Sequence, residues 1–167
     1  CMASAVTAYR QAFGADGPPP TYGDIPEADT HVVWGANPAV AHPVLYEWLV
    51  ESVEQGDGRL VVVDPVKTKT AADADVHVRP EPGTDLALAR ATLAHAGESG
   101  GVDRSFVEDH TEGFERMRES LPDIEVAADV ADVSSGAIAE LAETFGDRTI
   151  VYWGMGVNQS AQGTDTA

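Results

Sequence analysis

Hydrophobic positions along the chain alternate between short continuous runs and stripes at helical spacing. Four runs rich in β-branched and aromatic residues predict strands at residues 30–34, 60–63, 75–80 and 148–153. The run at 60–63 reads Leu-Val-Val-Val, and such continuous apolar character is typical of central strands in parallel sheets, which are buried on both faces.

Between these runs, apolar residues recur every three or four positions and predict helices at residues 2–13, 44–53, 85–96, 103–109, 111–120 and 134–145. Gly14 suits the end of the first helix, and Thr84 is a favoured N-cap residue for the third. Residues 14–23 read as a loop, and 67–74 as a short helix or loop. The predicted buried stripe of the second helix is Val44, Leu45, Trp48, Leu49 and Val53.

Strands that alternate with helices indicate an α/β fold, a three-layer α/β/α sandwich around a mainly parallel, Rossmann-like sheet. No repeat or low-complexity tract divides the chain, so residues 1–167 are expected to form one domain. In such sheets ligands bind beyond the carboxyl ends of the strands. That rule predicts a rim made of residues 35–42, 64–67, 82–85 and 154–159.

The first rim segment follows a strand and precedes a helix. Gly35 permits close backbone approach, Asn37 can donate and accept hydrogen bonds, and the helix N-terminus attracts phosphate. A turn built on Asn-Pro, with no ligand, explains the same residues equally simply.

The other rim segments carry weaker signals. Asp64 ends a buried strand, where nucleotide folds place an acid against a ribose or base, and a helix cap is the alternative. Thr84 and Asp85 offer a hydroxyl and a carboxylate at a helix start, although a simple cap is favoured. Residues 154–156 are half of a G-x-G-x-x-G loop, which any tight strand-to-helix turn also explains.

The charge balance restricts the partners. The chain has 28 acidic and 10 basic residues, a net charge of −18, which repels phosphate backbones and anionic lipids. We therefore expect no nucleic-acid and no membrane partner. Acid-rich, lysine-poor surfaces are typical of proteins that work in multimolar salt, so we expect a halophilic source, with an acidic protein of ordinary salt tolerance as the alternative.

Cysteine use and the chain ends bear on the compartment and on completeness. A single cysteine excludes an internal disulfide, and the five histidines show no metal-like spacing. No apolar run reaches the roughly 20 residues that span a bilayer, and no signal segment is visible, so a cytoplasmic location is expected. The first residue is Cys rather than Met, and the last five carry no helix or strand signal, so both ends are expected to be cut from a larger multidomain protein.

Several blocks follow one another in a fixed order. They are Cys1-Met-Ala-Ser-Ala-Val6, Phe13-Gly-Ala-Asp-Gly-Pro-Pro19, Tyr22-Gly-Asp-Ile-Pro-Glu-Ala-Asp29, Trp34-Gly-Ala-Asn-Pro-Ala-Val-Ala-His-Pro43, Val63-Asp-Pro-Val-Lys-Thr-Lys-Thr-Ala-Ala-Asp-Ala-Asp75, Pro82-Gly-Thr-Asp-Leu-Ala-Leu88, His110-Thr-Glu-Gly-Phe114 and Trp153-Gly-Met-Gly-Val-Asn-Gln-Ser160. Together they resemble the molybdopterin oxidoreductase family that uses the molybdenum bis-molybdopterin guanine dinucleotide cofactor. Within that family the residues of these blocks are most similar to those of assimilatory nitrate reductases, and a haloarchaeal source would suit the composition.

By position, the resemblance implies that the Cys1 sulfur binds molybdenum, which makes Cys1 the catalytic residue. It also implies that residues of all four rim segments bind the cofactor, with Gly35 and Asn37 as direct contacts and Met155 and Gln159 near the pterin. The full set is Trp34, Gly35, Asn37, Pro38, Ala39, His42, Asp64, Pro65, Lys67, Gly83, Thr84, Asp85, Gly154, Met155 and Gln159.

Three departures from the family pattern matter. Val66 stands where an arginine is common, so one phosphate or base contact is expected to be missing or supplied by Lys67. Residues 121–133 are shorter and more acidic than the pattern, and no structure is predicted for them. The family's [4Fe–4S] cysteine cluster is not in this segment and is expected in the remaining domains of a longer parent chain.

The resemblance implies that the parent enzyme reduces nitrate to nitrite by oxygen-atom transfer, with electrons from a donor such as ferredoxin, and that this segment alone is inactive. A formate dehydrogenase is the alternative within the family, and tungsten replaces molybdenum in some relatives. A nucleotide-binding module without chemistry is the alternative outside it.

The charge pattern predicts that the chain loses structure in low salt. At low ionic strength the −18 charge is poorly screened, so self-repulsion favours expanded states. Circular dichroism in multimolar and in millimolar salt measures this, and a spectrum that is the same in both would contradict the prediction.

Overall fold

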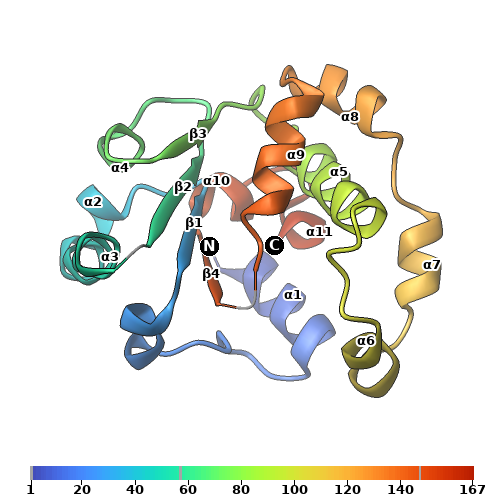
Figure 1. The fold of residues 1–167 in the computed structure, drawn as a ribbon, viewed down its shortest axis with the longest axis horizontal. Helices are drawn as coiled ribbons and strands as arrows, with labels where there is room; N and C mark the ends of the chain where they lie inside the picture. The colour runs from blue at the N-terminus through green and yellow to red at the C-terminus, as the bar shows by residue number, and fades with distance from the viewer. Residues whose placement is uncertain (1, 57, 147) are drawn as a thin grey trace.

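A four-stranded sheet forms the centre of the molecule. The structure, a computed structural model, describes residues 2–56, 58–146 and 148–167. The strands are β1 (Thr30–Trp34), β2 (Arg59–Val63), β3 (Val76–Val78) and β4 (Thr149–Trp153), and all pair in parallel in the order β3-β2-β1-β4 (Figure 1). This is the order of the first four strands of a doubly wound sheet. The strand order, and not the strand direction, reverses between β1 and β4.

Helices cover both faces of this sheet (Figure 1). On one face lie α2 (Pro38–Ala41), α3 (Pro43–Gln55) and α4 (Lys69–Ala72), and on the other lie α5 (Asp85–Glu98), α8 (Ile124–Ala131), α9 (Ser135–Glu143) and α10 (Met155–Asn158). The predicted α/β class and three-layer arrangement are therefore confirmed.

The strand side chains alternate between these two layers. Val32 and Val61 face the cluster formed with α5, α8 and α9, whereas Val33 and Val62 face the cluster formed with α3 and α4. All four are fully buried. Because both faces of the central strands are covered, their sequences are continuously apolar rather than alternating.

The remaining elements extend beyond the sandwich. They are α1 (Ala3–Phe13), the 3₁₀ helix η1 (Tyr22–Glu27), α6 (Arg104–His110), α7 (Phe114–Glu119) and α11 (Gly163–Thr166). Helix α1 packs against α11, so both ends of the described chain lie near one another (Figure 1). No helix among the described residues combines the length and apolar character needed to cross a bilayer.

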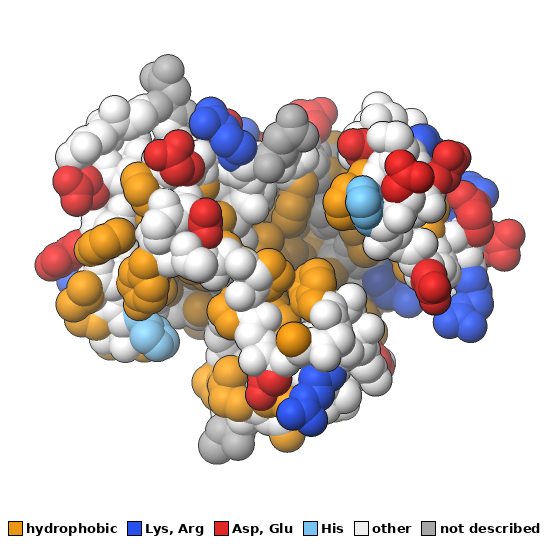
Figure 2. Space-filling view, turned by 90° about the horizontal axis from the view of Figure 1, so that it is seen from below, with side chains coloured by type: hydrophobic (Ala, Val, Ile, Leu, Met, Phe, Trp, Pro, Cys, Tyr) orange, Lys and Arg blue, Asp and Glu red, His pale blue; other side chains and the backbone are white. Residues whose placement is uncertain are grey.

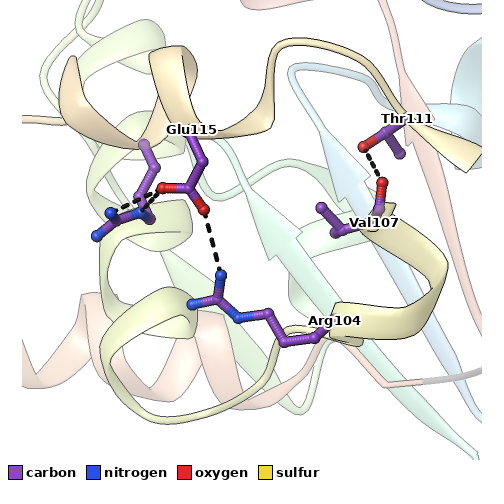
Figure 3. A network of polar contacts seen from close by, with 5 residues as sticks. Arg104, Val107, Thr111 and Glu115 are labelled. Atoms are coloured by element: carbon purple, nitrogen blue, oxygen red, sulfur yellow. Dashed lines mark hydrogen bonds and ion pairs between the residues drawn. The ribbon is translucent and has the colours of Figure 1, made fainter. Parts of the chain in front are cut away.

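Helices α6 and α7 contain no buried residue and are tied to each other by charge. Glu115 pairs with Arg118 at 2.7 Å and with Arg104 at 3.3 Å (Figure 3). Its hydrogen bond with Arg118 is the main reason that the pKa of Glu115 is lowered. The Arg104 guanidinium also lies 5.6 Å from the centre of the Phe114 ring. The two helices therefore form an exposed arm beside the sandwich.

Several sequence predictions need correction. In α3, Val44 and Trp48 are exposed rather than buried, and Tyr46 is buried instead, because its hydroxyl reaches Asp73 of the neighbouring α4 turn at 2.6 Å. Helix α8 occupies the stretch for which no structure was predicted. The last residues, expected to carry no helix or strand, contain α11, whose Gly163 packs against the backbone of Asn158.

A buried hydrogen-bonded chain links β1, β4, α3 and η1. His31 is fully buried, with Nδ1 3.0 Å from the Tyr152 hydroxyl and Nε2 3.2 Å from Ser52 Oγ. Ser52 Oγ donates to the Ile25 carbonyl at 2.9 Å, so it accepts from Nε2–H, and Nδ1 accepts from Tyr152. Burial lowers the pKa of His31, which favours the neutral imidazole that this arrangement of donors and acceptors uses.

We predict that His31 makes the stability of the fold depend on pH. Its folded pKa lies below its ordinary value of 6.5, so the folded state binds fewer protons than the unfolded state. The free energy of unfolding should be level above about pH 6.5, the ordinary pKa of histidine. It should fall as the pH decreases from there through the folded pKa of His31. Urea unfolding between pH 7.5 and 5.5 in high salt measures the slope, which His31→Gln should reduce. The exposed-histidine variant His42→Gln should keep the slope, and an equal loss in both variants would contradict the assignment.

Candidate functional site

Four loops meet at the carboxyl edge of the sheet, one after each strand (Figure 1). They comprise residues 35–37, 64–68, 79–84 and 154. The predicted rim is therefore a real feature of the fold, because parallel strands end at the same edge.

The loops after β1 and β4 are joined backbone to backbone. Gly154 N donates to Trp34 O at 3.2 Å, and Gly156 N donates to Gly35 O at 2.9 Å. Gly35 N in turn donates to Val63 O at 2.9 Å, which ties the same loop to β2. These bonds continue the pairing of the sheet into the loops and hold their relative positions.

Glycine is required at this junction. Gly35 has a φ of 56°, and a Cβ there would lie 3.0 Å from Val157 N. A Cβ on Gly156 would lie 2.8 Å from both Gly35 Cα and Gly35 O, and one on Gly154 would lie 2.8 Å from Ala36 Cβ. The half-motif that looked weak in the sequence is therefore a close contact between two loops, at the point where the strand order reverses.

The N-terminus of α2 has little capacity left for a ligand. Pro38 has no N–H, and Ala39 N donates to the hydroxyl of Thr70 at 3.1 Å. The next two amides of the helix donate to the Asn37 carbonyl at 3.0 and 2.9 Å. The first backbone donors of α2 therefore already have partners within the chain, and phosphate binding at this helix N-terminus stays a prediction.

Hydrogen bonds within the loop after β2, and from side chains in and directly after β3, hold this loop in place. Asp64 Oδ1 accepts from Val66 N at 2.8 Å, and His77 Nε2 donates to Asp64 O at 2.8 Å. Arg79 Nε donates to Pro65 O at 3.3 Å. Arg79 was not among the predicted site residues, because it fell inside the strand predicted at residues 75–80; β3 ends at Val78, which places Arg79 at the start of the loop.

The loop after β3 leads into α5, a helix of 14 residues. Trp34 Nε1 donates to Asp85 Oδ1 at 2.8 Å, so this carboxylate joins two rim segments. Thr84 stands at the N-cap as predicted, but its hydroxyl donates to Glu81 O at 2.6 Å instead of capping the helix. Gly83 has a φ of 89° and open space around it. The first turn of α5 therefore has no side-chain cap from the described residues.

The segment from the end of β4 to residue 160, which includes α10, has both exposed and buried side chains. Met155 is 38% exposed and Gln159 is exposed, whereas Trp153 Nε1 donates to Asn158 Oδ1 at 3.3 Å. The hydroxyl of Ser160 is buried and has no hydrogen-bond partner among the described residues. A buried hydroxyl without a partner is costly, so it is a natural contact for a bound polar group.

Cations gather at this edge in spite of the acidic surface. Lys67 and Lys69, the only lysines of the chain, are exposed beyond β2, and Arg79 is exposed beyond β3. Val66, directly before Lys67 in the chain, is 62% exposed and leaves Lys67 as the cation of that turn. These three cations share the rim with the carboxylates of Asp64, Glu81 and Asp85, so the positive charge is local to the turn that carries the lysines.

Two predicted residues are not among those that the structure places on the rim. Cys1 lies outside the described residues. His42 is exposed between α2 and α3, one short helix beyond the first rim loop. The other predicted residues lie on the four loops or at the ends of the elements that flank them.

A second feature is an apolar groove of about 940 Å³ between β4, α5 and the exposed arm of α6 and α7. Figure 2 shows the surface hollowed between lobes, with hydrophobic side chains along the hollow. Strand β4 pairs with β1 on one side, and no described strand pairs with its other edge. The apolar side chains that line the groove include Leu93, Phe114, Met117, Phe145, Val151 and Trp153.

These features define a doubly wound α/β domain with a polar, partly cationic rim at its carboxyl edge. The chain belongs to the molybdopterin oxidoreductase family, which matches residues 1–167. It is 60% identical over 167 residues to an assimilatory nitrate reductase of Haloferax mediterranei, which covers all of this chain and 23% of the relative. Formate dehydrogenase H of Escherichia coli is more distant, 31% identical over 96% of this chain and 23% of its own length.

A solved structure agrees with the fold. Acetylene hydratase from Pelobacter acetylenicus superposes with a TM-score of 0.84 at 21% identity, over 99% of this chain and 23% of that one. The chain therefore spans about a quarter of the length of these relatives.

The family implies a molybdenum–pterin cofactor, and the rim fits such a group. The uncapped first turn of α5 and the exposed lysines offer donors for phosphate, and Ser160 offers a buried hydroxyl without a partner among the described residues. Lys67 and the first turn of α5 follow different strands at the same edge of the sheet, as an extended anionic ligand requires.

We predict that Gly156→Ala destabilises the chain. The added Cβ meets Gly35 backbone at 2.8 Å, and overpacking of this kind costs about 1–3 kcal/mol. Gly97→Ala, inside α5 with nothing within 4 Å of the new Cβ, should be neutral or stabilise by up to about 1 kcal/mol. Denaturant unfolding measures both, and equal stabilities of the two variants would argue against the close contact.

Proposed function

We propose that this chain is a cofactor-binding domain of a molybdenum enzyme that reduces nitrate to nitrite. The observation that carries the proposal is the 60% identity to an assimilatory nitrate reductase over the whole chain, together with a rim that suits an anionic ligand. Formate dehydrogenases remain the alternative, supported by relatives about half as identical.

The proposed ligand of the rim is the guanine dinucleotide form of the molybdopterin cofactor. Lys67 and the first turn of α5 would bind phosphate, because they supply a positive charge and free backbone donors. Asp64 keeps one carboxylate oxygen besides the one that accepts from Val66 N, which suits a ribose hydroxyl or a guanine amine. Met155 and Gln159 would face the pterin.

The other proposed contacts serve mainly as framework. Gly35 and Gly154 bring two loops together, and the Trp34–Asp85 hydrogen bond joins the first loop to α5. Pro38 and Ala39 are buried, so they would shape the loop rather than offer polar groups to a ligand.

When bound, the cofactor supplies the two-electron chemistry that converts nitrate and two protons into nitrite and water. The protein's part is to bind it, to orient it at the carboxyl edge and to supply the Cys1 sulfur to the metal. The role of Cys1 rests on the resemblance, because the residue lies outside those described.

The proposed partners include other domains of a longer chain. The apolar groove lies beside the open edge of β4, and the chain corresponds to only 23% of its relative. A further part of the same enzyme would cover this groove. The remaining domains would also carry the [4Fe–4S] cluster and accept electrons from a donor such as ferredoxin.

The direct test uses the longer enzyme that contains these residues, purified with its cofactor. We expect nitrite from nitrate with a reduced viologen dye as electron donor, and no oxidation of formate. Oxidation of formate without nitrate reduction would favour the formate dehydrogenase alternative.

The rim is tested by the double variant Lys67→Gln, Lys69→Gln in the same enzyme. Loss of two cations should lower the guanine nucleotide released on denaturation by about 2- to 10-fold. Arg116→Gln, an exposed cation on α7, is the matched control. Equal cofactor content in all three proteins would contradict phosphate binding by these lysines.

A further inference from the structure

Thr70 is fully buried on α4 behind the first rim loop, and neither the sequence nor the proposed cofactor contacts single it out. Its hydroxyl donates to Asn37 Oδ1 at 2.8 Å and accepts from Ala39 N at 3.1 Å. Its backbone N also donates to Asn37 Oδ1, at 3.3 Å. A single residue therefore holds both the side chain of Asn37 and the start of α2.

These contacts determine which way the Asn37 carboxamide points. A backbone N–H can only donate, so the atom of Asn37 that faces Thr70 N must be the oxygen. The Asn37 amide nitrogen then faces away from Thr70, and it makes no hydrogen bond to any described residue. Asn37 is half-buried at the rim, so this amide is a donor for something outside the chain.

The same contacts change the character of the first rim loop. The first backbone donors of α2 are absent at Pro38 and used at Ala39 and beyond, as described above. The donor that this loop retains on a side chain is the Asn37 amide. Its partner must be a hydrogen-bond acceptor, and a cation or a donor group would find no counterpart there.

We propose that Thr70 is a positioning residue that fixes Asn37 as a hydrogen-bond donor to an acceptor oxygen of the bound guanine nucleotide. This inference rests on the proposed function, because it assumes that a guanine nucleotide occupies the rim. The acceptor is an oxygen of the phosphates or the carbonyl of the base, which are chemically alike to an amide donor.

The test compares Thr70→Val with Thr70→Ser in the longer enzyme that contains these residues, freed of its cofactor and kept in high salt. Valine has the shape of threonine without the hydroxyl, so Asn37 Oδ1 loses the 2.8 Å bond and keeps only the 3.3 Å bond from the backbone N of residue 70, which holds it less firmly. Serine keeps both hydrogen bonds of the hydroxyl. Calorimetric titration with guanosine diphosphate should show about 3- to 10-fold weaker binding for Thr70→Val and near-native binding for Thr70→Ser.

A matched control separates positioning from general damage. Thr92 is a buried threonine of α5 whose hydroxyl donates to the Leu88 carbonyl, away from the rim loops. Thr92→Val should leave affinity unchanged even if it alters stability. In nuclear magnetic resonance spectra at saturating guanosine diphosphate, the Asn37 side-chain amide signals should shift in the unmodified chain and in Thr70→Ser, and should shift less in Thr70→Val.

Titration with guanosine and with pyrophosphate distinguishes the two acceptor oxygens, because the Thr70→Val loss should appear with only one of them. Native affinity of Thr70→Val, or an Asn37 amide that does not respond in the unmodified chain, would overturn the role of Thr70 alone. No binding of guanosine diphosphate by the unmodified chain would overturn the proposed rim ligand and this role together.

Discussion

Gly35 and Gly156 approach backbone to backbone between β1 and β4, closer than any side chain would allow. The contact lies where the strand order reverses, the position at which doubly wound sheets open a crevice for ligands. Here the loops fill part of that crevice with their own backbone. The arrangement of the carboxyl edge therefore depends on this junction, since it sets how far apart the ligand-facing groups of the two loops lie.

Around that junction the rim separates framework from ligand-facing groups. Trp34 donates a hydrogen bond to Asp85, and Thr70 donates one to the side-chain oxygen of Asn37. These hydrogen bonds hold the loops together. The lysines beyond β2 and the uncapped turn of α5 remain available to a ligand. In a chain of net charge −18, such local cations offset a general repulsion of anions.

The sandwich and its lateral surface differ in how completely they are packed. Both faces of the central strands are buried, yet α6 and α7 contribute no buried residue, and an apolar groove lies between them and β4. The ion pair between Arg104 and Glu115 joins these two helices to each other, and the pair between Arg118 and Glu115 lies within α7. The nitrate reductase relative is about four times longer than this chain, and the proposed further domains would cover the groove on this side.

The sequence by itself determined the α/β class, all four strands and the rim, because strand runs and glycine turns are local signals read from a few residues. It also carried the family resemblance, since the blocks are contiguous. The tertiary structure alone decided that Tyr46 rather than Trp48 is buried, that Asp85 is bound by Trp34, and that Thr70 orients Asn37. Each of these depends on side chains 27 to 51 residues apart meeting in space, and no local period encodes such a meeting.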